Sequence, residues 1–281
     1  MRPHALITGG SSGIGRAVAA KLAEEGYSLS LIARREALLE DAATELRGMF
    51  VHPEQEVFTH AADVADSAAA IAAVGAATAR LGVPDLVITS AGMAHPGYFE
   101  DISLHVHEQS MAVNYFGTLY VVNAVLPAMR ARRSGRIVMI ASGASLLGIF
   151  GYTSYCPSKF ALKGLAETLH AELKAEGVGI SIAYPPDTET PMLAEENKIK
   201  PAETKLITGL VKPWSADKVA DCVLDGIARG RFAITPGATI AAMNRMPGII
   251  LPVLRWYSDR LAAKVRRGKA LGGAPIAEAG R

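Results

Sequence analysis

Near the N-terminus the sequence reads His4-Ala5-Leu6-Ile7-Thr8-Gly9-Gly10-Ser11-Ser12-Gly13-Ile14-Gly15, and the helix-forming stretch 16–23 follows it. A short apolar strand, a glycine-rich turn and an amphipathic helix can form a phosphate site. Glycine lets the backbone approach a pyrophosphate, and the helix N-terminus offers free N–H groups. An isolated turn of this kind can also use its glycines for backbone geometry alone, so the interpretation depends on the rest of the chain.

A second pattern lies in the middle of the chain, where Tyr155 and Lys159 stand four residues apart and Ser142 follows the apolar segment 137–141. Positions i and i+4 share one face of a helix, so we expect the Lys159 ammonium one turn from the Tyr155 phenol. A nearby cation favours the phenolate and is expected to lower the pKa of Tyr155 toward neutrality. Although a Tyr-x-x-x-Lys pair alone is common on helix surfaces, its combination with Ser142 and the glycine-rich turn predicts interconversion of a ketone and an alcohol.

The composition predicts one large α/β domain. The chain has 281 residues, of which 50% are hydrophobic, enough for a buried parallel sheet. Short apolar strands alternate with alanine-rich helices, which favours a doubly wound parallel sheet, a Rossmann fold. We expect residues 1–235 to form this domain, with a substrate loop near 185–212, and residues 236–281 to form a C-terminal extension.

The composition also narrows the partners and the compartment. The formal net charge is 29 − 27 = +2, too close to zero to suggest a nucleic-acid partner. The seven histidines show no spacing typical of a metal site, so no metal is expected. Cys156 and Cys222 form no disulfide framework, and an apolar strand follows Met1 almost at once, which favours a cytoplasmic protein without a signal peptide.

The glycine-rich turn and the Ser, Tyr and Lys set together resemble the short-chain dehydrogenase/reductase family, over the range from about His4 to Thr190. The resemblance implies a Rossmann fold and a nicotinamide cofactor. It also implies four catalytic residues, Ser142, Tyr155, Lys159 and Asn114. Asn114 is similar to the residue that steadies a proton-relay water in this family.

The same resemblance, together with the glycine-rich turn and the charge of the second strand, predicts the cofactor site. The residues expected to bind the cofactor are Gly9, Ser11, Ser12, Gly13, Ile14, Gly15, Arg34, Arg35, Asp63, Val64, Ala91, Gly92, Tyr155, Lys159, Pro185, Thr188 and Thr190. Two positions depart from the family pattern. Ser90 stands where an asparagine is usual and Pro186 where a glycine is usual, so fine geometry is affected rather than the proton-transfer set.

The end of the second strand indicates which nicotinamide cofactor is used. The strand 28–32 is followed by Ala33, Arg34 and Arg35, without the acidic residue that NAD-binding enzymes place there for the ribose hydroxyls. Arg34 offers a planar, permanently charged group suited to the 2′-phosphate of NADPH. Alternatively, both arginines form a solvated helix start, since Glu36 follows them.

The substrate is indicated by segments away from the cofactor motifs. Residues 183–191, 195–198 and 200–204, and likewise 91–94 and 148–153, resemble the 3-ketosphinganine reductases of this family. The resemblance implies NADPH-dependent reduction of 3-ketosphinganine, a long-chain aminoketone, to sphinganine in sphingolipid biosynthesis.

The substrate ammonium needs an acceptor, for which Asp187, Glu189 and Glu195 are candidates, although each of them can equally be a solvated loop residue. Two other functions stay open. One is reduction of another carbonyl, such as a β-ketoacyl thioester, a steroid or a xenobiotic ketone; the other is a non-catalytic NADP-binding sensor.

The C-terminal extension has a distinct composition. Residues 246–254 are strongly apolar, but even as a helix they span only about 13 Å, too short for a hydrocarbon core of about 30 Å. A basic cluster with aromatic residues follows within 255–269, which is typical of an element lying in a membrane surface. The alternative is packing over the substrate cleft or at a subunit contact. We also expect a homo-oligomer.

Overall fold

The computed structural model describes residues 2–271, and residues 272–281 of the expected extension lie outside it. A seven-stranded sheet forms the centre, in the order β3-β2-β1-β4-β5-β6-β9, and every neighbouring pair is parallel. The strands are β1 His4–Thr8, β2 Ser28–Ala33, β3 Val57–Ala61, β4 Leu86–Thr89, β5 Arg136–Ile140, β6 Gly179–Ala183 and β9 Ala233–Ile234. This topology confirms the expected doubly wound fold.

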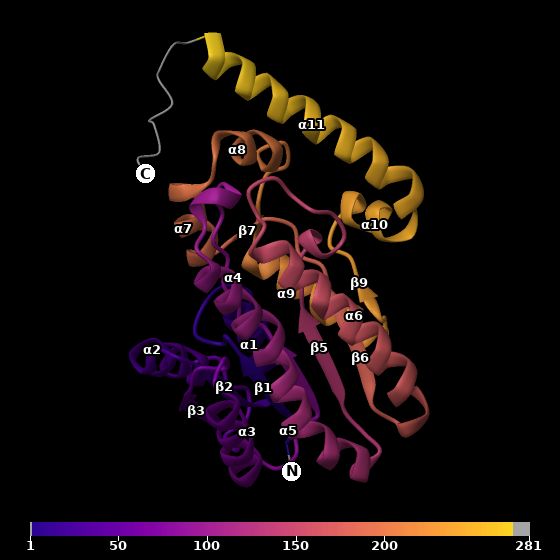
Figure 1. Cartoon of the computed structure of the whole chain (residues 1–281). Helices are drawn as coiled ribbons and strands as arrows, with labels where there is room; N and C mark the ends of the chain where they lie inside the picture. Colours follow the sequence, from indigo (N-terminus) through magenta and orange to yellow (C-terminus); the bar gives the residue numbers. More distant parts are fainter. Residues whose placement is uncertain (1, 272–281) are drawn as a thin grey trace.

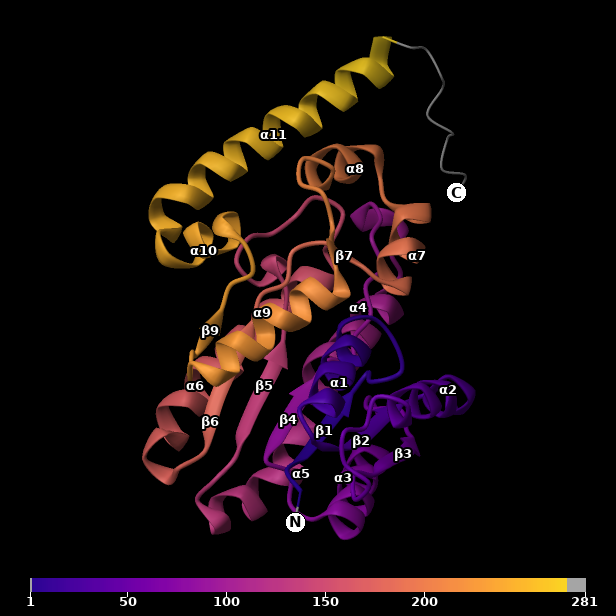
Figure 2. The same cartoon turned by 180° about the vertical axis from the view of Figure 1, so that it is seen from behind.

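Helices cover both faces of the sheet (Figures 1 and 2). One face carries α3 Ser67–Leu81, α4 Leu104–Met111, α5 Gly117–Arg132 and α6 Tyr155–Leu173, and the other carries α1 Gly13–Glu24, α2 Glu36–Arg47 and α9 Ala216–Ala228. Alternate residues of one strand enter opposite cores: Leu6 packs with the first set of helices, and Ala5 and Ile7 pack with the second. The parallel strands are therefore apolar on both sides, as burial on two faces requires.

The longest apolar helical stretch in the described residues, Leu104–Arg132, is long enough to cross a bilayer by length and composition. Its apolar residues Val121, Val125 and Met129 are buried in the core on the sheet, which accounts for that composition. The stretch is not continuous α-helix, because residues Ala112–Phe116 form a π-helical segment between α4 and α5.

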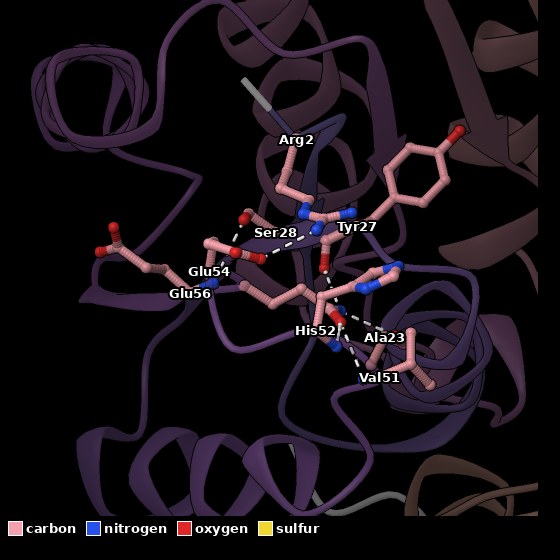
Figure 3. Close-up of polar contacts among 9 residues, drawn as sticks. Arg2, Ala23, Tyr27, Ser28, Val51, His52, Glu54 and Glu56 are labelled. Atoms are coloured by element: carbon pink, nitrogen blue, oxygen red, sulfur yellow. Dashed lines mark hydrogen bonds and ion pairs between the residues drawn. The ribbon is translucent and has the colours of Figure 1, made fainter.

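The turn before β3 is joined to the segment between α1 and β2 by hydrogen bonds of Gln55, whose partners Ala23, Tyr27, Val51 and His52 are labelled in Figure 3. The buried Gln55 amide accepts from the backbone N–H groups of Val51 and His52 and donates to the carbonyls of Ala23 and Tyr27, at 2.8 to 3.0 Å. One side chain thus ties the end of α1 to the turn before β3. These contacts lie at the amino ends of the strands, opposite to where a doubly wound fold binds its ligands.

Several smaller elements lie beyond the carboxyl ends of the strands. They are η1 Phe99–Asp101, η3 Gly143–Ser145, α7 Pro191–Ile199, α8 Ala202–Thr208 and the strand pair β7 Thr188–Glu189 and β8 Trp214–Ser215, while η4 Lys174–Glu176 follows α6. The expected substrate loop near 185–212 therefore contains two helices.

The C-terminal extension forms two helices, α10 Ala238–Arg245 and α11 Pro247–Leu271, and α11 runs across α8 and α10 at the same end of the molecule (Figures 1 and 2). Ile240 and Met243 of α10 are buried in the main core, and Ile250, Leu251 and Leu254 of α11 pack against it. The extension is thus fastened to the domain by apolar contacts.

Candidate active site

A cleft opens at the carboxyl ends of β1, β4, β5 and β6. Its floor comes from the residues that follow these strands, among them Gly9, Ser90, Ser142 and Pro185, and α6 and α7 form its walls. Each of these strands ends at the same sheet edge because all are parallel, so residues far apart in the sequence meet there. The cleft lies at the position where doubly wound folds bind nucleotides.

The glycines of the turn leave no space for a side chain at their own positions. Gly9 has φ +69°, and a Cβ there would lie 2.8 Å from the backbone N of Ala91. A Cβ on Gly15 would lie 2.5 Å from the carbonyl oxygen of Gly9, and one on Gly13 would lie 3.0 Å from Thr190. Bare backbone therefore reaches the cleft at the N-terminus of α1, where N–H groups and the helix dipole suit a pyrophosphate. These residues fit a nicotinamide dinucleotide.

The structure brings most of the predicted cofactor residues together. Those that line the cleft are Gly9, Ser12, Gly13, Ile14, Ala91, Gly92, Tyr155, Lys159, Pro185, Thr188 and Thr190. Gly15 supports the turn from behind, and Val64 is buried against Gly117.

The remaining predicted residues, Ser11, Arg34, Arg35 and Asp63, do not line the cleft. Arg34 Nη1 lies 3.9 Å from Asp63 Oδ2 just beyond the carboxyl ends of β2 and β3, with 65% of the Arg34 side chain exposed. Arg34 is therefore an accessible cation at the same edge of the sheet as the cleft.

Three catalytic candidates converge in the cleft. Tyr155 begins α6, and its hydroxyl is hydrogen-bonded to Ser142, which follows β5. Lys159 lies one turn further along α6, with Nζ 5.7 Å from the centroid of the Tyr155 ring and 3.1 Å from the Ile140 carbonyl to which it donates. A hydroxyl pair beside a buried amine can hold and protonate a substrate oxygen.

The expected lowering of the Tyr155 pKa is not found. Burial raises the pKa of the Tyr155 phenol above its ordinary value, and the hydrogen bond from Ser142 opposes this only in part. The carboxylates of Glu196 and Asp187 also raise it. Burial lowers the pKa of Lys159 itself to about 8, so the lysine has less charge to offer near that pH. Burial desolvates both groups, and this effect on the pKa cannot be seen in the spacing of Tyr155 and Lys159.

Asn114 lies on the π-helical segment and is fully buried. Its Oδ1 accepts from Met93 N at 2.8 Å, and its Nδ2 donates to the Met93 carbonyl at 2.9 Å and to Ser158 Oγ at 2.8 Å. The side chain thus joins the segment after β4 to α6 directly behind Lys159. A π-helical turn is frequent at functional sites, which agrees with a role for this position.

Thr8 is a positioning residue that was not singled out from the sequence. Its hydroxyl accepts from the backbone N–H groups of Ser90 and Ala91, both at 3.2 Å. This contact holds the segment after β4 against the glycine-rich turn. The position of a threonine at the end of a strand next to such a turn was the only available signal.

The substrate side of the cleft contains a polar cluster of which only Asp187 was named from the sequence. The Tyr152 hydroxyl donates to Glu196, and Lys200 Nζ lies 4.0 Å from Glu196 and 3.6 Å from Asp187. Burial raises the pKa of Glu196, while the Tyr152 hydrogen bond and Lys200 lower it. One helical face carries Leu193, Glu196 and Lys200. The shared face with a leucine was the signal in the sequence that Glu196 points inward.

The three predicted amine acceptors separate in the structure. Asp187 lines the cleft, whereas Glu189 and Glu195 do not. The Glu195 carboxylate is exposed and pairs with Lys198 at 2.5 Å. Glu195 therefore faces solvent one residue away from the buried Glu196.

A family model described as short chain dehydrogenase matches residues 3–201. The chain belongs to the short-chain dehydrogenase family. Within the family it is 40% identical, over 83% of this chain and 71% of the relative, to a protein named 3-dehydrosphinganine reductase from Danio rerio.

Solved structures agree with this assignment. A short-chain dehydrogenase from Sphingobium yanoikuyae in complex with NADPH has a TM-score of 0.75 and 26% identity, covering 99% of this chain and 98% of that chain. A family member from Burkholderia phymatum in complex with NAD has a TM-score of 0.77 and 28% identity, covering 87% of this chain and 92% of that chain. This short-chain dehydrogenase is therefore a nicotinamide-dependent oxidoreductase.

Proposed function

We propose that this short-chain dehydrogenase reduces 3-ketosphinganine to sphinganine with NADPH. The proposal is carried by one observation: Tyr155 and Ser142 lie in the same cleft as the buried carboxylate of Glu196. A carbonyl next to an ammonium group matches this pairing of a proton donor with a negative charge. Similarity to 3-dehydrosphinganine reductase supports the same substrate.

In this mechanism Tyr155 donates its proton to the alkoxide that develops on the keto oxygen. Ser142 hydrogen-bonds the same oxygen and orients it, while Lys159 keeps the phenol in position and holds the cofactor ribose. Asn114 fixes the backbone of Met93 and the helix that carries Tyr155. We assign to it the anchoring of the relay that returns a proton to the phenol. The glycine-rich turn would hold NADPH, which would supply the hydride.

The direct test uses purified protein, NADPH and 3-ketosphinganine dispersed in detergent or liposomes. Oxidation of NADPH is followed by absorbance, and sphinganine is identified by mass spectrometry. We expect far faster turnover of 3-ketosphinganine than of an acetoacetyl thioester or a steroid ketone. Preference for one of the latter assigns the enzyme to another carbonyl, and absence of turnover with every ketone favours the non-catalytic sensor.

Preference for NADPH over NADH rests on Arg34. A charge-assisted contact with the 2′-phosphate contributes about 1.5 to 3 kcal/mol, or roughly ten- to 150-fold in affinity. Arg34→Ala should therefore weaken NADPH binding by this factor and leave NADH binding nearly unchanged, whereas Arg47→Ala at the other end of α2 should affect neither. Equal weakening of both cofactors by Arg34→Ala would contradict the assignment.

We further propose that α11 contacts the anionic cytoplasmic face of a membrane. While one face of α11 packs inward, Ile249, Val253 and Trp256 are 68%, 60% and 54% exposed. Arg255 and Arg260 are exposed on the same helix, and Arg260 lies 4.1 Å from the Trp256 ring centroid. Exposed apolar and aromatic groups among cations are typical of an interfacial helix.

The test replaces the three outward residues with serine, because truncation after Pro236 would also remove Ile240 and Met243 from the core. Wild type should sediment with phosphatidylserine liposomes and dissociate as salt rises, and the Ile249→Ser, Val253→Ser, Trp256→Ser variant should remain in solution. If the wild-type protein does not sediment with the liposomes, the membrane proposal is wrong, and the role of this face is packing or contact with a second copy.

A further inference from the structure

The substrate side of the cleft holds charged groups that proton transfer does not use. Asp187 and Glu196 line the cleft, and Lys200 is the cation that faces them both. Only 11% of the Glu196 side chain and 2% of the Lys200 side chain are exposed. Glu196 is largely removed from water, and its contact with Lys200, at 4.0 Å, is a long one. A buried carboxylate with incomplete partners is unfavourable, so this part of the cleft favours a cationic ligand.

The cluster lies next to the proton donor. The ring of Tyr152, whose hydroxyl donates to Glu196, has its centroid 5.7 Å from that of the Tyr155 ring. The contacts of Tyr152 and Lys200 both fall on Glu196 Oε2, and no hydrogen bond or ion pair to Oε1 occurs within residues 2–267, whose side chains the structure describes. Oε1 can therefore accept a further hydrogen bond.

We propose that Glu196 accepts the ammonium of the substrate, with Asp187 as the second negative group, and that Tyr152 and Lys200 position the Glu196 carboxylate. The inference rests on the proposed reduction of 3-ketosphinganine. In that substrate the amine is on the carbon next to the keto carbon. When Tyr155 and Ser142 hold the keto oxygen, the ammonium therefore lies within a few ångströms of them, in the cleft that Glu196 also lines.

This arrangement selects a 2-amino ketone over the ketone without the amine. A ligand without the cation leaves the carboxylate buried and without its full complement of partners, which a site built for polar contacts penalises strongly. The burial that raises the pKa of Glu196 also makes its pairing with a cation stronger than at the surface. Glu196 is thus a specificity-determining residue rather than a proton donor.

The test compares two substrates of equal chain length, 3-ketosphinganine and the corresponding hydroxy ketone without the amine. Glu196→Gln keeps the shape of the side chain and removes its charge. With NADPH, we expect kcat/KM for the aminoketone to fall roughly ten- to 150-fold, and kcat/KM for the amine-free ketone to stay nearly constant. Glu195→Gln, one residue away and exposed, serves as the matched control and should change neither value.

Asp187→Asn provides a second variant that does not depend on tolerance of a buried glutamine, because 38% of the Asp187 side chain is exposed. It should lower kcat/KM selectively for the aminoketone as well. Equal losses on both substrates, or no loss in either variant, would overturn the assignment of the amine site. If the wild type reduces both ketones equally well, the amine site is refuted but the reductase function stands. If the wild type reduces neither ketone, the proposed function itself is refuted.

Discussion

Lys159→Met is expected to abolish turnover and at the same time to stabilise the protein. Burial lowers the pKa of Lys159 from 10.5 to about 8. Each pKa unit corresponds to about 1.4 kcal/mol, so the charged lysine costs the folded state about 3 kcal/mol near neutral pH. Methionine loses the hydrogen bond to the Ile140 carbonyl, a contribution of about 1 kcal/mol. The net gain in the free energy of unfolding is therefore about 2 kcal/mol.

The stability difference between Lys159→Met and wild type should depend on pH, and the pKa shift of Lys159 predicts the direction. Because the folded-state pKa of Lys159 lies below the unfolded value, the unfolded chain binds more protons between pH 8 and 10.5. The contribution of Lys159 to stability therefore rises with pH across this window, and below it the full cost remains. The advantage of Lys159→Met over wild type should be largest below pH 8 and should shrink toward pH 10.5.

The assay is urea denaturation of wild type and variant at several pH values, beside NADPH turnover. Lys163→Met is the matched control, because Lys163 lies one turn further along α6, is partly exposed and pairs with Glu167 at 3.1 Å. A surface pair of this kind contributes little, so the control should stay within about 1 kcal/mol of wild type. A destabilised Lys159→Met variant, or a stability difference independent of pH, would refute the reasoning.

Three further predictions concern the same cleft. Tyr155→Phe keeps the ring and removes the transferable proton, so turnover should fall about 100-fold or more while fluorescence titration still shows NADPH binding; near-normal turnover would contradict this role. Asn114→Ala removes three hydrogen bonds, so urea denaturation should show a loss of about 3 kcal/mol, which unchanged stability would refute. Gly15→Ala places a Cβ 2.5 Å from the Gly9 carbonyl, and a strain of about 1 to 3 kcal/mol should weaken NADPH binding roughly five- to 150-fold, a result that calorimetry can test.

The fold followed from local features that do not depend on tertiary detail. The strand, turn and helix at residues 4–24 require little more than glycine geometry and apolar periodicity, and β1, the glycine-rich turn and α1 appear where these predict. The approach of Ser142, Tyr155 and Lys159 was predictable for the same reason, because helix periodicity places two of them and the end of β5 places the third.

The electrostatics and the substrate side were less predictable. The direction of the Tyr155 pKa shift depends on burial, which cannot be predicted from the residues around Tyr155 in the sequence. Glu196 was overlooked in favour of Glu195 and Glu189, because which of several neighbouring carboxylates faces inward depends on how α7 docks on the domain. The two helices within 185–212 also depend on that docking.

The sheet topology has a consequence for how such an enzyme acquires a new substrate. Residues 185–232 leave the sheet at the end of β6 and return at β9, the strand that pairs directly with β6 through Ile182 with Ala233 and Ala183 with Ile234. Departure and return points are thus neighbouring strands, about 4.8 Å apart. The excursion begins with the cofactor residues Pro185, Thr188 and Thr190 and ends with α9, which packs on α1. Its middle, residues 191–212, contains Glu196 and forms α7 and α8. Grafting residues 191–212 from a relative should therefore transfer the choice of ketone and leave the cofactor half intact.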